Sequence, residues 1–368
     1  MTATAPSGIF STSYRHELAL RRGRSARLGA VAVTALLIVF PFVAGANWQP
    51  IAVFALIAGI GAIGLQLLTG LAGQVSLGHA AFLGTGAYTA SWLGGDQGLP
   101  VYIWLPAAGL VAAALGGLVG PVATRLRGLY LAVVTLALLF IMSYVFEQWT
   151  SVTGGSVGRS TMALTVNGTD LLDGVTLPVL GIELNGNQAY WFFVLAVLVG
   201  LGYAARNIQR TRIGRAFLSV RERDLTASVA GVPVTRMKTA AFVVSSFYAG
   251  IAGALLAAYQ SYVLPTQWGL ILSIEFVAMI VIGGLGTVFG AVIGAAFVRA
   301  IPELVRSLTG VLPFIEQESD PSGGVTVELV SQFLYGAAIV TVLVFEPAGL
   351  YGLWIRFRSF WKTWPWSY

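Results

Sequence analysis

Few of the side chains that carry out chemistry occur in this sequence. It has no cysteine and two histidines, His16 and His79, so neither a thiolate nor a histidine-based metal site is expected. No stretch reads GxxxxGKS or GxxxxGKT, the pattern of a phosphate-binding loop, and no serine nucleophile elbow, HExxH helix or carboxylate pair is evident. The sequence therefore predicts no catalytic site and no cofactor in this chain. If ATP drives the protein, another subunit binds it.

A segment near the start, residues 68–90, combines polar side chains with residues that break helices. It reads LTGLAGQVSLGHAAFLGTGAYTA and carries five glycines together with Thr69, Gln74, Ser76 and His79. Irregular backbone at membrane depth is tolerated only where protein buries it or where it lines a cavity. If the chain unwinds here and a helix begins near Ser76, the amide groups at its start would suit a carboxylate. His79, about one turn into that helix, would hydrogen-bond a ligand or brace the helix.

Three interpretations of residues 68–90 stay open. The segment lines a substrate pathway, packs tightly at a subunit interface, or reverses the chain at the cytoplasmic surface, since Thr69 to Gln74 fall near the inner end of a span. No two of its glycines are spaced four apart as a GxxxG repeat requires, so tight packing alone does not explain them. A second glycine cluster, Gly283 to Gly294, follows another inward-running span in the same orientation.

Ionisable residues are rare in the apolar runs. Arg299 and Glu303 lie four apart on an expected helix and are predicted to pair, and Pro302 between them predicts that the span ends or kinks there. Glu275 lies near the outer end of its span, where it either snorkels or faces the pathway. A proton relay needs a chain of such groups, which these residues and His79 do not supply.

Composition indicates a membrane protein. Apolar residues make up 57% and charged residues 10% of the 368 positions, with a mean hydropathy of +0.81, whereas soluble domains carry about 25% charged residues. The net charge of +6 comes from short basic patches beside apolar runs. This is the pattern of a polytopic membrane protein and not of a nucleic-acid-binding surface. We predict an all-α fold without a nucleic-acid partner.

About ten transmembrane helices, some short or broken, are expected from the lengths of the apolar runs. They cover residues 28–46, 51–68, 75–95, 101–123, 128–147, 189–205, 238–260, 269–283, 287–308 and 327–345. Arginine and lysine gather in the tail, in two inner loops and after the last span, so both termini are predicted to be cytoplasmic. The expected parts are a basic tail 1–27, a transmembrane domain 28–346 and a cytoplasmic tail 347–368.

Two regions outside the spans have alternative interpretations. The first span and Ala44-Gly45-Ala46 imitate a signal peptide, although the apolar run is long enough to cross the membrane. The external loop 148–188 forms either a small cap or a structureless tether. Val175 to Glu183 suits a short strand, which Pro178 would confine to a sheet edge.

A cytoplasmic segment, residues 206–237, carries the most specific pattern. Arg215 to Ala230 contains no glycine or proline and is followed by Gly231, which predicts one capped helix of about four turns. Its partial apolar face consists of Phe217, Val220, Leu225 and Val229. The adjoining Arg221, Glu222, Arg223 and Asp224 carry mixed charge. A lipid-facing helix would be more uniformly basic, so we expect this helix to dock on a protein.

This segment resembles the coupling loop of ATP-binding cassette (ABC) importer permeases, and in particular the branched-chain amino acid permease family. The residues that carry the resemblance are Gly214, Arg215, Ala216, Arg221, Asp224, Ala227, Gly231, Lys238, Ala241, Phe242, Ser245, Ala249, Gly250, Gly253, Ala254 and Leu255. The opening segment, the turn at Thr153 to Ser156, the stretch 283–297 and the run 344–353 are also similar to that family. Val157 stands where asparagine is expected, and the basic tail is longer than the pattern.

The resemblance implies an inner-membrane permease subunit of a bacterial importer that moves a small neutral amino acid inward. Its implied partners are two ATPase subunits, which use ATP and magnesium, a second related permease in a heterodimer, an external solute-binding protein and membrane lipid. The expected coupling residues are Gly214, Arg215, Arg221, Glu222, Asp224, Ala227 and Gly231. The expected pathway residues are Thr69, Gly73, Gln74, Ser76, Gly78, His79, Glu275, Gly283 and Gly284.

Alternative functions also stay open. Within the family, a urea or short-amide permease is the nearest. Outside the family, the chain could be an ion-coupled carrier that acts alone, or a membrane-bound receptor or scaffold. Measurements of flux distinguish these two classes from an ABC permease.

Overall fold

The computed structural model describes residues 24–123, 126, 128–166, 169–177, 182–308, 315–316, 325–346 and 348–363. The chain divides into two compact units, Met1–Gly45 and Ala46–Tyr368. In the first unit, helix α2 (Arg24–Val43) coincides with the first expected span and contains Pro41. The remainder of the fold belongs to the second unit.

Long apolar helices dominate the second unit and coincide with the other expected spans. They are α3 (Trp48–Leu65), α4 (His79–Ala90), α5 (Val101–Ala123), α6 (Leu129–Gln148), α8 (Gly186–Arg210), α11 (Val234–Gln260), α12 (Leu270–Gly283), α13 (Val288–Leu308) and α14 (Val327–Phe345). Among the described residues, six helices are long and apolar enough to cross a membrane: Trp48–Leu71, Val101–Val122, Tyr130–Gln148, Gly186–Arg210, Val234–Gln260 and Val288–Ser307. Three shorter apolar helices cover Val33–Val43, Leu270–Gly283 and Val327–Val342. The prediction of a helical, polytopic membrane protein is confirmed.

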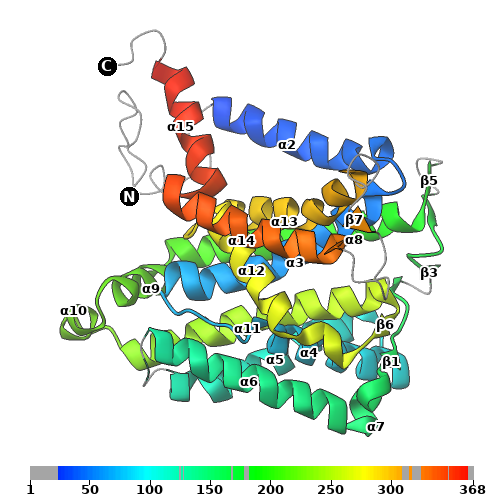
Figure 1. Ribbon diagram of the computed structural model, residues 1–368, viewed down its shortest axis with the longest axis horizontal. Coiled ribbons are helices and arrows are strands. Elements are labelled where there is room, and N and C mark those ends of the chain that lie inside the picture. The colour runs from blue at the N-terminus through cyan, green and yellow to red at the C-terminus, as the bar shows by residue number, and fades with distance from the viewer. Residues whose placement is uncertain are drawn as a thin grey trace. The chain divides into compact units, whose positions relative to one another are not determined.

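Helix α11 forms the core of the second unit together with α3, α4 and α5 (Figure 1). In the most apolar 18 residues of Trp48–Leu71, which includes α3, 78% are buried, and in those of α11 72% are buried. These helices therefore lie inside the bundle. Small residues allow this packing, because helices in lipid associate through close van der Waals contact. A side chain at Gly253 of α11 would collide with the backbone carbonyl of Leu83 in α4, and Gly86 lies equally close to Gly250.

The connections gather at the two ends of the bundle. Helices α5, α6, α11 and α13 run in similar directions in Figure 1. At one end lie the short helices α9 (Arg212–Glu222) and α10 (Asp224–Val229), and at the other lie strands β1 (Arg159–Ser160) and β6 (Tyr262–Val263). The turn of α7 (Thr150–Thr153) and the 3-10 helix η3 (Gly155–Val157) lead into β1, and η4 (Pro265–Trp268) follows β6. The bundle therefore has a loop-and-strand end and a coupling end.

The loop after α6 folds into short hairpins and is not a structureless tether. Strand β1 pairs antiparallel with β6, β2 (Thr165–Val166) with β3 (Thr169–Asp170), and β4 (Val175–Leu177) with β5 (Ile182–Leu184). The expectation of a single strand from Val175 to Glu183 is wrong, because the chain reverses between β4 and β5. Pro178, which has no N–H for a strand ladder, lies in that connection, outside the described residues. A fourth pair, β7 (Ile315–Glu316) with β8 (Val325–Thr326), is parallel.

Sequence reasoning missed one helix. Residues 347–368 were expected only as a cytoplasmic tail, yet α15 (Gly349–Thr363) follows α14 after a turn at Ala348. Gly349 has φ +69°, a conformation that favours glycine, and its Cα lies against Gly284 at the end of α12. The start of α15 is therefore fixed against the α12 to α13 connection.

Candidate functional site

The chain unwinds between α3 and α4, as the sequence predicts. A π-helical turn, η1 (Gln66–Leu71), ends α3, and residues 72–78 are irregular before α4 begins. The helix starts at His79 and not near Ser76, so His79 is its first residue. The start is set by α6, because the Leu77 N–H donates to Thr135 Oγ1 at 2.9 Å and the Gly78 backbone packs on the Thr135 carbonyl.

The amide groups at the start of α4 already have partners in this conformation. The Ala80 N–H donates to Ser273 Oγ of α12 at 3.0 Å, and the Gly78 N–H donates to Ser76 Oγ at 3.4 Å. These side chains occupy donors that the sequence assigned to a substrate carboxylate. The start of α4 is thus joined to α6 and α12, and a ligand would have to displace these bonds.

His79 braces three helices. Its Nε2 lies 3.0 Å from the Gly61 carbonyl of α3, and its ring meets Phe276 of α12 edge-on at 5.0 Å between centroids. The side chain is buried, with 1% of its surface exposed. Of the two roles expected for His79, this geometry matches bracing.

Buried amides and hydroxyls surround the irregular segment. Gln66, Gln74 and Ser76 are each at most 3% exposed, and Ser245 of α11 is equally buried. Gln66 Nε2 donates to the Gly284 carbonyl at 3.2 Å. Within the described part of the chain, neither polar atom of the Gln74 amide has a hydrogen-bond partner. An unsatisfied buried amide is costly, and such groups in native proteins call for an explanation such as water or ligand.

The two glycine clusters meet beside α9. The Arg221 guanidinium donates a hydrogen bond to the Gly70 carbonyl of η1, and its Nη1 is 3.8 Å from the site of a Cβ on Gly286. Gly73 has φ +69°, and a Cβ there would be 2.8 Å from Arg221 Cγ. A Cβ on Gly70 would be 2.9 Å from the Gly286 nitrogen. Residues 70–73 therefore lie at the coupling end of the bundle, and Gly283 and Gly284 end α12 at the same place.

The coupling segment is two helices, and the expected single helix is wrong. Arg223 separates α9 from α10 with an extended backbone of φ −155° and ψ 112°. The break follows from Asp224, which turns inward to form an ion pair of 2.7 Å with the buried Lys238 of α11. The predicted end is confirmed, since Gly231 has φ +82° and donates to the Ser228 carbonyl at 3.0 Å.

The break also divides the expected apolar face. Phe217 and Val220 of α9 are buried against the bundle, at 0% and 4% exposure, whereas Leu225 and Val229 of α10 are 71% and 89% exposed. The prediction of one continuous face is therefore wrong, because the turn at Arg223 rotates α10 relative to α9. Of the other expected coupling residues, Gly214 and Ala227 are buried, and Arg215 and Glu222 are exposed.

Charged residues in the spans form ion pairs, one between two helices and one within a helix. Arg299 of α13 lies 3.2 Å from Glu275 of α12, and Glu303 lies 3.6 Å from Arg306, one helical turn away. The predicted pairing of Arg299 with Glu303 is thus wrong, because α12 packs beside α13 and brings Glu275 within reach. Helix α13 also continues through Pro302 to Leu308 and does not end there.

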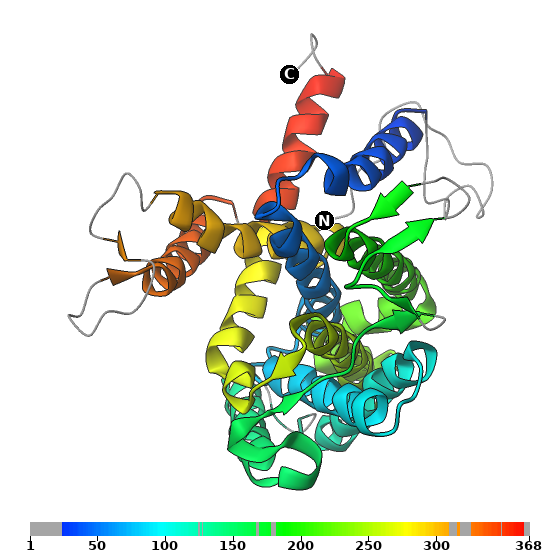
Figure 2. The ribbon, with the colours of Figure 1, turned by 90° about the vertical axis from the view of Figure 1, so that its right-hand side faces the viewer.

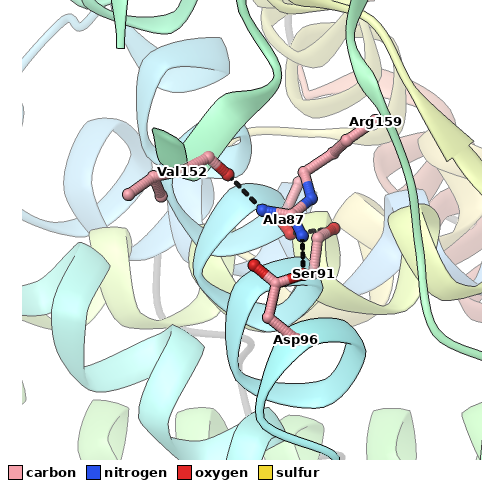
Figure 3. Close-up of polar contacts among 5 residues, drawn as sticks. All are labelled: Ala87, Ser91, Asp96, Val152 and Arg159. Atoms are coloured by element: carbon pink, nitrogen blue, oxygen red, sulfur yellow. Dashed lines mark hydrogen bonds and ion pairs between the residues drawn. The ribbon is translucent and has the colours of Figure 1, made fainter. Parts of the chain in front are cut away.

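Arg159 joins two loop segments at the opposite end of the bundle, and sequence reasoning did not select it as a site residue. Its guanidinium lies between the Val152 carbonyl and the Asp96 carboxylate and donates to both (Figure 3). Asp96 ends a second π-helical turn, η2 (Ser91–Asp96), in which Ser91 Oγ donates to the Ala87 carbonyl at 2.8 Å. The available signal was that Arg159 is the single basic residue between α6 and α8.

The site thus consists of broken helices, neutral buried polar groups, internally paired charges and two short helices, α9 and α10, at one end. These features define a multi-pass permease subunit. The chain belongs to the family described as branched-chain amino acid transport system permease component, whose model matches residues 48–343. It is an ABC transporter permease, a subunit without enzymatic activity.

Relatives agree with this assignment. The chain is 29% identical to the high-affinity branched-chain amino acid transport system permease protein LivM of Salmonella typhimurium over 339 residues, which cover 88% of this chain and 74% of the relative. LivM of Escherichia coli gives 29% over 345 residues with the same coverage. The ribose import permease protein RbsC of Haemophilus influenzae is 24% identical over 246 residues, covering 64% of this chain and 70% of the relative. No solved structure gives a significant match.

Proposed function

We propose that this permease passes a small neutral amino acid, of the branched-chain class, into the cell, driven by ATP hydrolysis in partner subunits. The observation that carries the proposal is the coupling end, where the exposed apolar helix α10 and the adjoining α9 are joined by part-buried contacts to α11 and to the break after α3. Leu225 and Val229 of α10 point away from the chain, and Asp224 beside them is paired with buried Lys238. An exposed apolar pair beside the mixed charges of α9 and Asp224 suits a protein groove.

The two ends of the bundle are each assigned to a proposed partner. An ATPase subunit seats α10 in a groove, a second, related permease with its own ATPase completes a heterodimeric pore, and a solute-binding protein docks on the hairpins at the opposite end. ATP and magnesium belong to the ATPase subunits. Since α9 and α10 then lie in the cytoplasm, both chain termini are assigned to the cytoplasmic side of a bacterial inner membrane. The basic residues on this segment agree with that side.

Movement of α10 has two routes into the bundle. The pair of Asp224 with Lys238 transmits it to α11, and the bond from Arg221 to Gly70 transmits it to η1. The Arg221 contact borders the irregular segment 72–78, because Gly73 packs on Arg221, and α11 contacts η1, which precedes that segment. We assign the substrate pathway to the buried face of this segment, with Gln74 and Ser76 as the polar contacts and Gly73, Gly78, Gly283 and Gly284 as the points where the backbone bends.

The substrate class rests on neutrality of the pathway and on the relatives. Glu275 is compensated by Arg299, and the buried polar side chains of the segment itself, Gln66, Gln74 and Ser76, are uncharged and suit a zwitterion or another neutral solute. The LivM proteins are named for branched-chain amino acids and RbsC for ribose. A neutral amide such as urea has compatible chemistry and is the competitor that transport assays must separate.

The test is uptake into proteoliposomes that contain the permease co-purified with its partner subunits. Radiolabelled leucine, urea and ribose are compared, each with ATP inside or outside the vesicle and with or without the binding protein. Leucine uptake that requires ATP on the ATPase side supports the proposal. Uptake by the permease alone under a proton or sodium gradient would overturn it in favour of an ion-coupled carrier, and absence of flux under all conditions would favour a receptor or scaffold.

A further inference from the structure

The last helix, α15, leaves the bundle at its coupling end. It follows α14 after the turn at Ala348, and its first turn packs on the connection between α12 and α13, where Tyr351 and Phe289 have ring centroids 6.1 Å apart. Arg356 forms an ion pair of 2.7 Å with Glu346 at the end of α14. In Figure 1 and Figure 2, α15 runs across the direction of α11 and α13. A helix with this placement lies along the surface of the membrane that the other helices cross.

Helix α15 has one apolar and one basic side. Helical spacing places six apolar residues on one side, namely Leu350, Leu353, Trp354, Phe357, Phe360 and Trp361, and it places Arg358, Ser359 and Lys362 on the other side together with Tyr351 and Ile355. On the apolar side, Leu353 and Trp354 are 48% and 54% exposed. This exposure leaves a row of large apolar side chains for an external partner.

The charge pattern identifies the partner as lipid. Residues 349–363 contain three basic residues and no acidic residue, whereas α9 and α10, which suit a protein groove, carry both signs. Tryptophan and phenylalanine are favoured at the level of the lipid headgroups, and arginine and lysine are attracted to anionic phosphates. Three further aromatic residues, Trp364, Trp366 and Tyr368, follow in the sequence.

We propose that α15 is an interfacial membrane helix that lies among anionic lipid headgroups of the leaflet on the side of α9 and α10. It fixes the coupling end at the membrane surface, because its base is joined through Gly349 to Gly284 at the end of α12. The assignment to the inner leaflet rests on the orientation given under the proposed function. The interfacial position itself does not depend on transport.

The chain suits a spin-label test because it has no native cysteine. Single cysteines are introduced as Phe357→Cys on the apolar side and Ser359→Cys on the basic side, and the assembled transporter is placed in nanodiscs that contain phosphatidylglycerol. Collision of each label with oxygen, which concentrates in lipid, and with a water-soluble nickel chelate is measured by electron paramagnetic resonance. We expect the ratio of oxygen to nickel accessibility to be several-fold higher at 357 than at 359.

Each other outcome overturns the proposal. Low accessibility of position 357 to both reagents means that another protein subunit covers α15, and high nickel accessibility at both positions means that the helix is in water. A second variant, Arg358→Glu with Lys362→Glu, should lower the ratio at position 357 in phosphatidylglycerol and leave it nearer its original value in phosphatidylcholine. An equal change in both lipids would also refute the role of lipid charge. Because no ATP or substrate is added, failure of transport leaves this readout intact.

Discussion

The guanidinium of Arg221 on α9 donates a hydrogen bond to the backbone carbonyl of Gly70 in the π-helical turn that ends α3. The two residues are 151 positions apart in the sequence. Their bond joins α9 to the π-helical turn η1, which ends the long apolar stretch Trp48–Leu71. Gly286, between α12 and α13, borders the same guanidinium. A displacement of α9 therefore acts directly on two points where the spans are irregular.

Replacing Arg221 should uncouple ATP hydrolysis from uptake. A hydrogen bond from a charged donor contributes about 1.5–3 kcal/mol, so Arg221→Ala is expected to reduce uptake by roughly 10- to 100-fold. ATP hydrolysis and co-purification of the ATPase should persist, because Leu225 and Val229 keep their exposed positions. The control is Arg206→Ala, an exposed arginine of α8 that is not among the expected coupling residues. Equal uptake by the two variants would remove Arg221 from the coupling route.

The pair of Asp224 with Lys238 should be needed for both folding and coupling. Lys238 is 7% exposed, so Asp224→Ala leaves a buried charge without compensation, a change that typically costs about 3–5 kcal/mol. We expect a lower unfolding temperature and loss of the ATPase stimulation that substrate and binding protein produce. Glu222→Ala, at an exposed neighbouring position, is the matched control for stability and should keep the original unfolding temperature.

A double variant separates these two effects. Asp224→Ala combined with Lys238→Met removes the buried charge, so the unfolding temperature should recover towards that of the original protein. Stimulation should stay low, because the connection between α10 and α11 is not restored. Full recovery of stimulation would show that the pair serves stability alone.

Local sequence signals were sufficient to predict the spans and the cap of α10. A run of about 20 apolar residues predicts a crossing without knowledge of its neighbours. Each of the ten expected spans coincides with a helix, and among the described residues six of these helices are long and apolar enough to cross a membrane. Gly231 ends α10 as expected because a left-handed cap depends on glycine at that position alone. The resemblance in residues 214–255 likewise identified the family that the comparison confirms.

Features that depend on distant contacts were not predictable. The break at Arg223 is set by the ion pair of Asp224 with Lys238, and Arg299 pairs with Glu275 because α12 packs against α13. The residue pattern within a single segment gives no information about either of these two ion pairs. Helix α15 is a different case, since its two-sided pattern is visible in the sequence and an interfacial helix could have been predicted from it.

Glycine packing between α4 and α11 gives a stability prediction. A Cβ on Gly253 would overlap the Leu83 carbonyl, which belongs to helix backbone and cannot rotate away, so Gly253→Ala should destabilise the protein by about 1–3 kcal/mol. Gly200→Ala is the control, because Gly200 lies in α8 with no atom within 4 Å of its added Cβ. Thermal unfolding of the purified complex in nanodiscs measures both. The packing argument fails if the two variants unfold at the same temperature.

Gln74 allows stability and transport to be separated at the proposed pathway. Its buried amide has no partner in the described structure, so Gln74→Leu removes an unsatisfied group and should leave the free energy of unfolding unchanged or raise it by about 1–3 kcal/mol. Uptake should nevertheless fall, because an apolar side chain offers no hydrogen bond to a polar solute. Gln97→Leu, at an exposed position after η2, is the control and should keep its uptake. Lower stability together with lower uptake would indicate that Gln74 supports the fold, and normal uptake would place the substrate elsewhere.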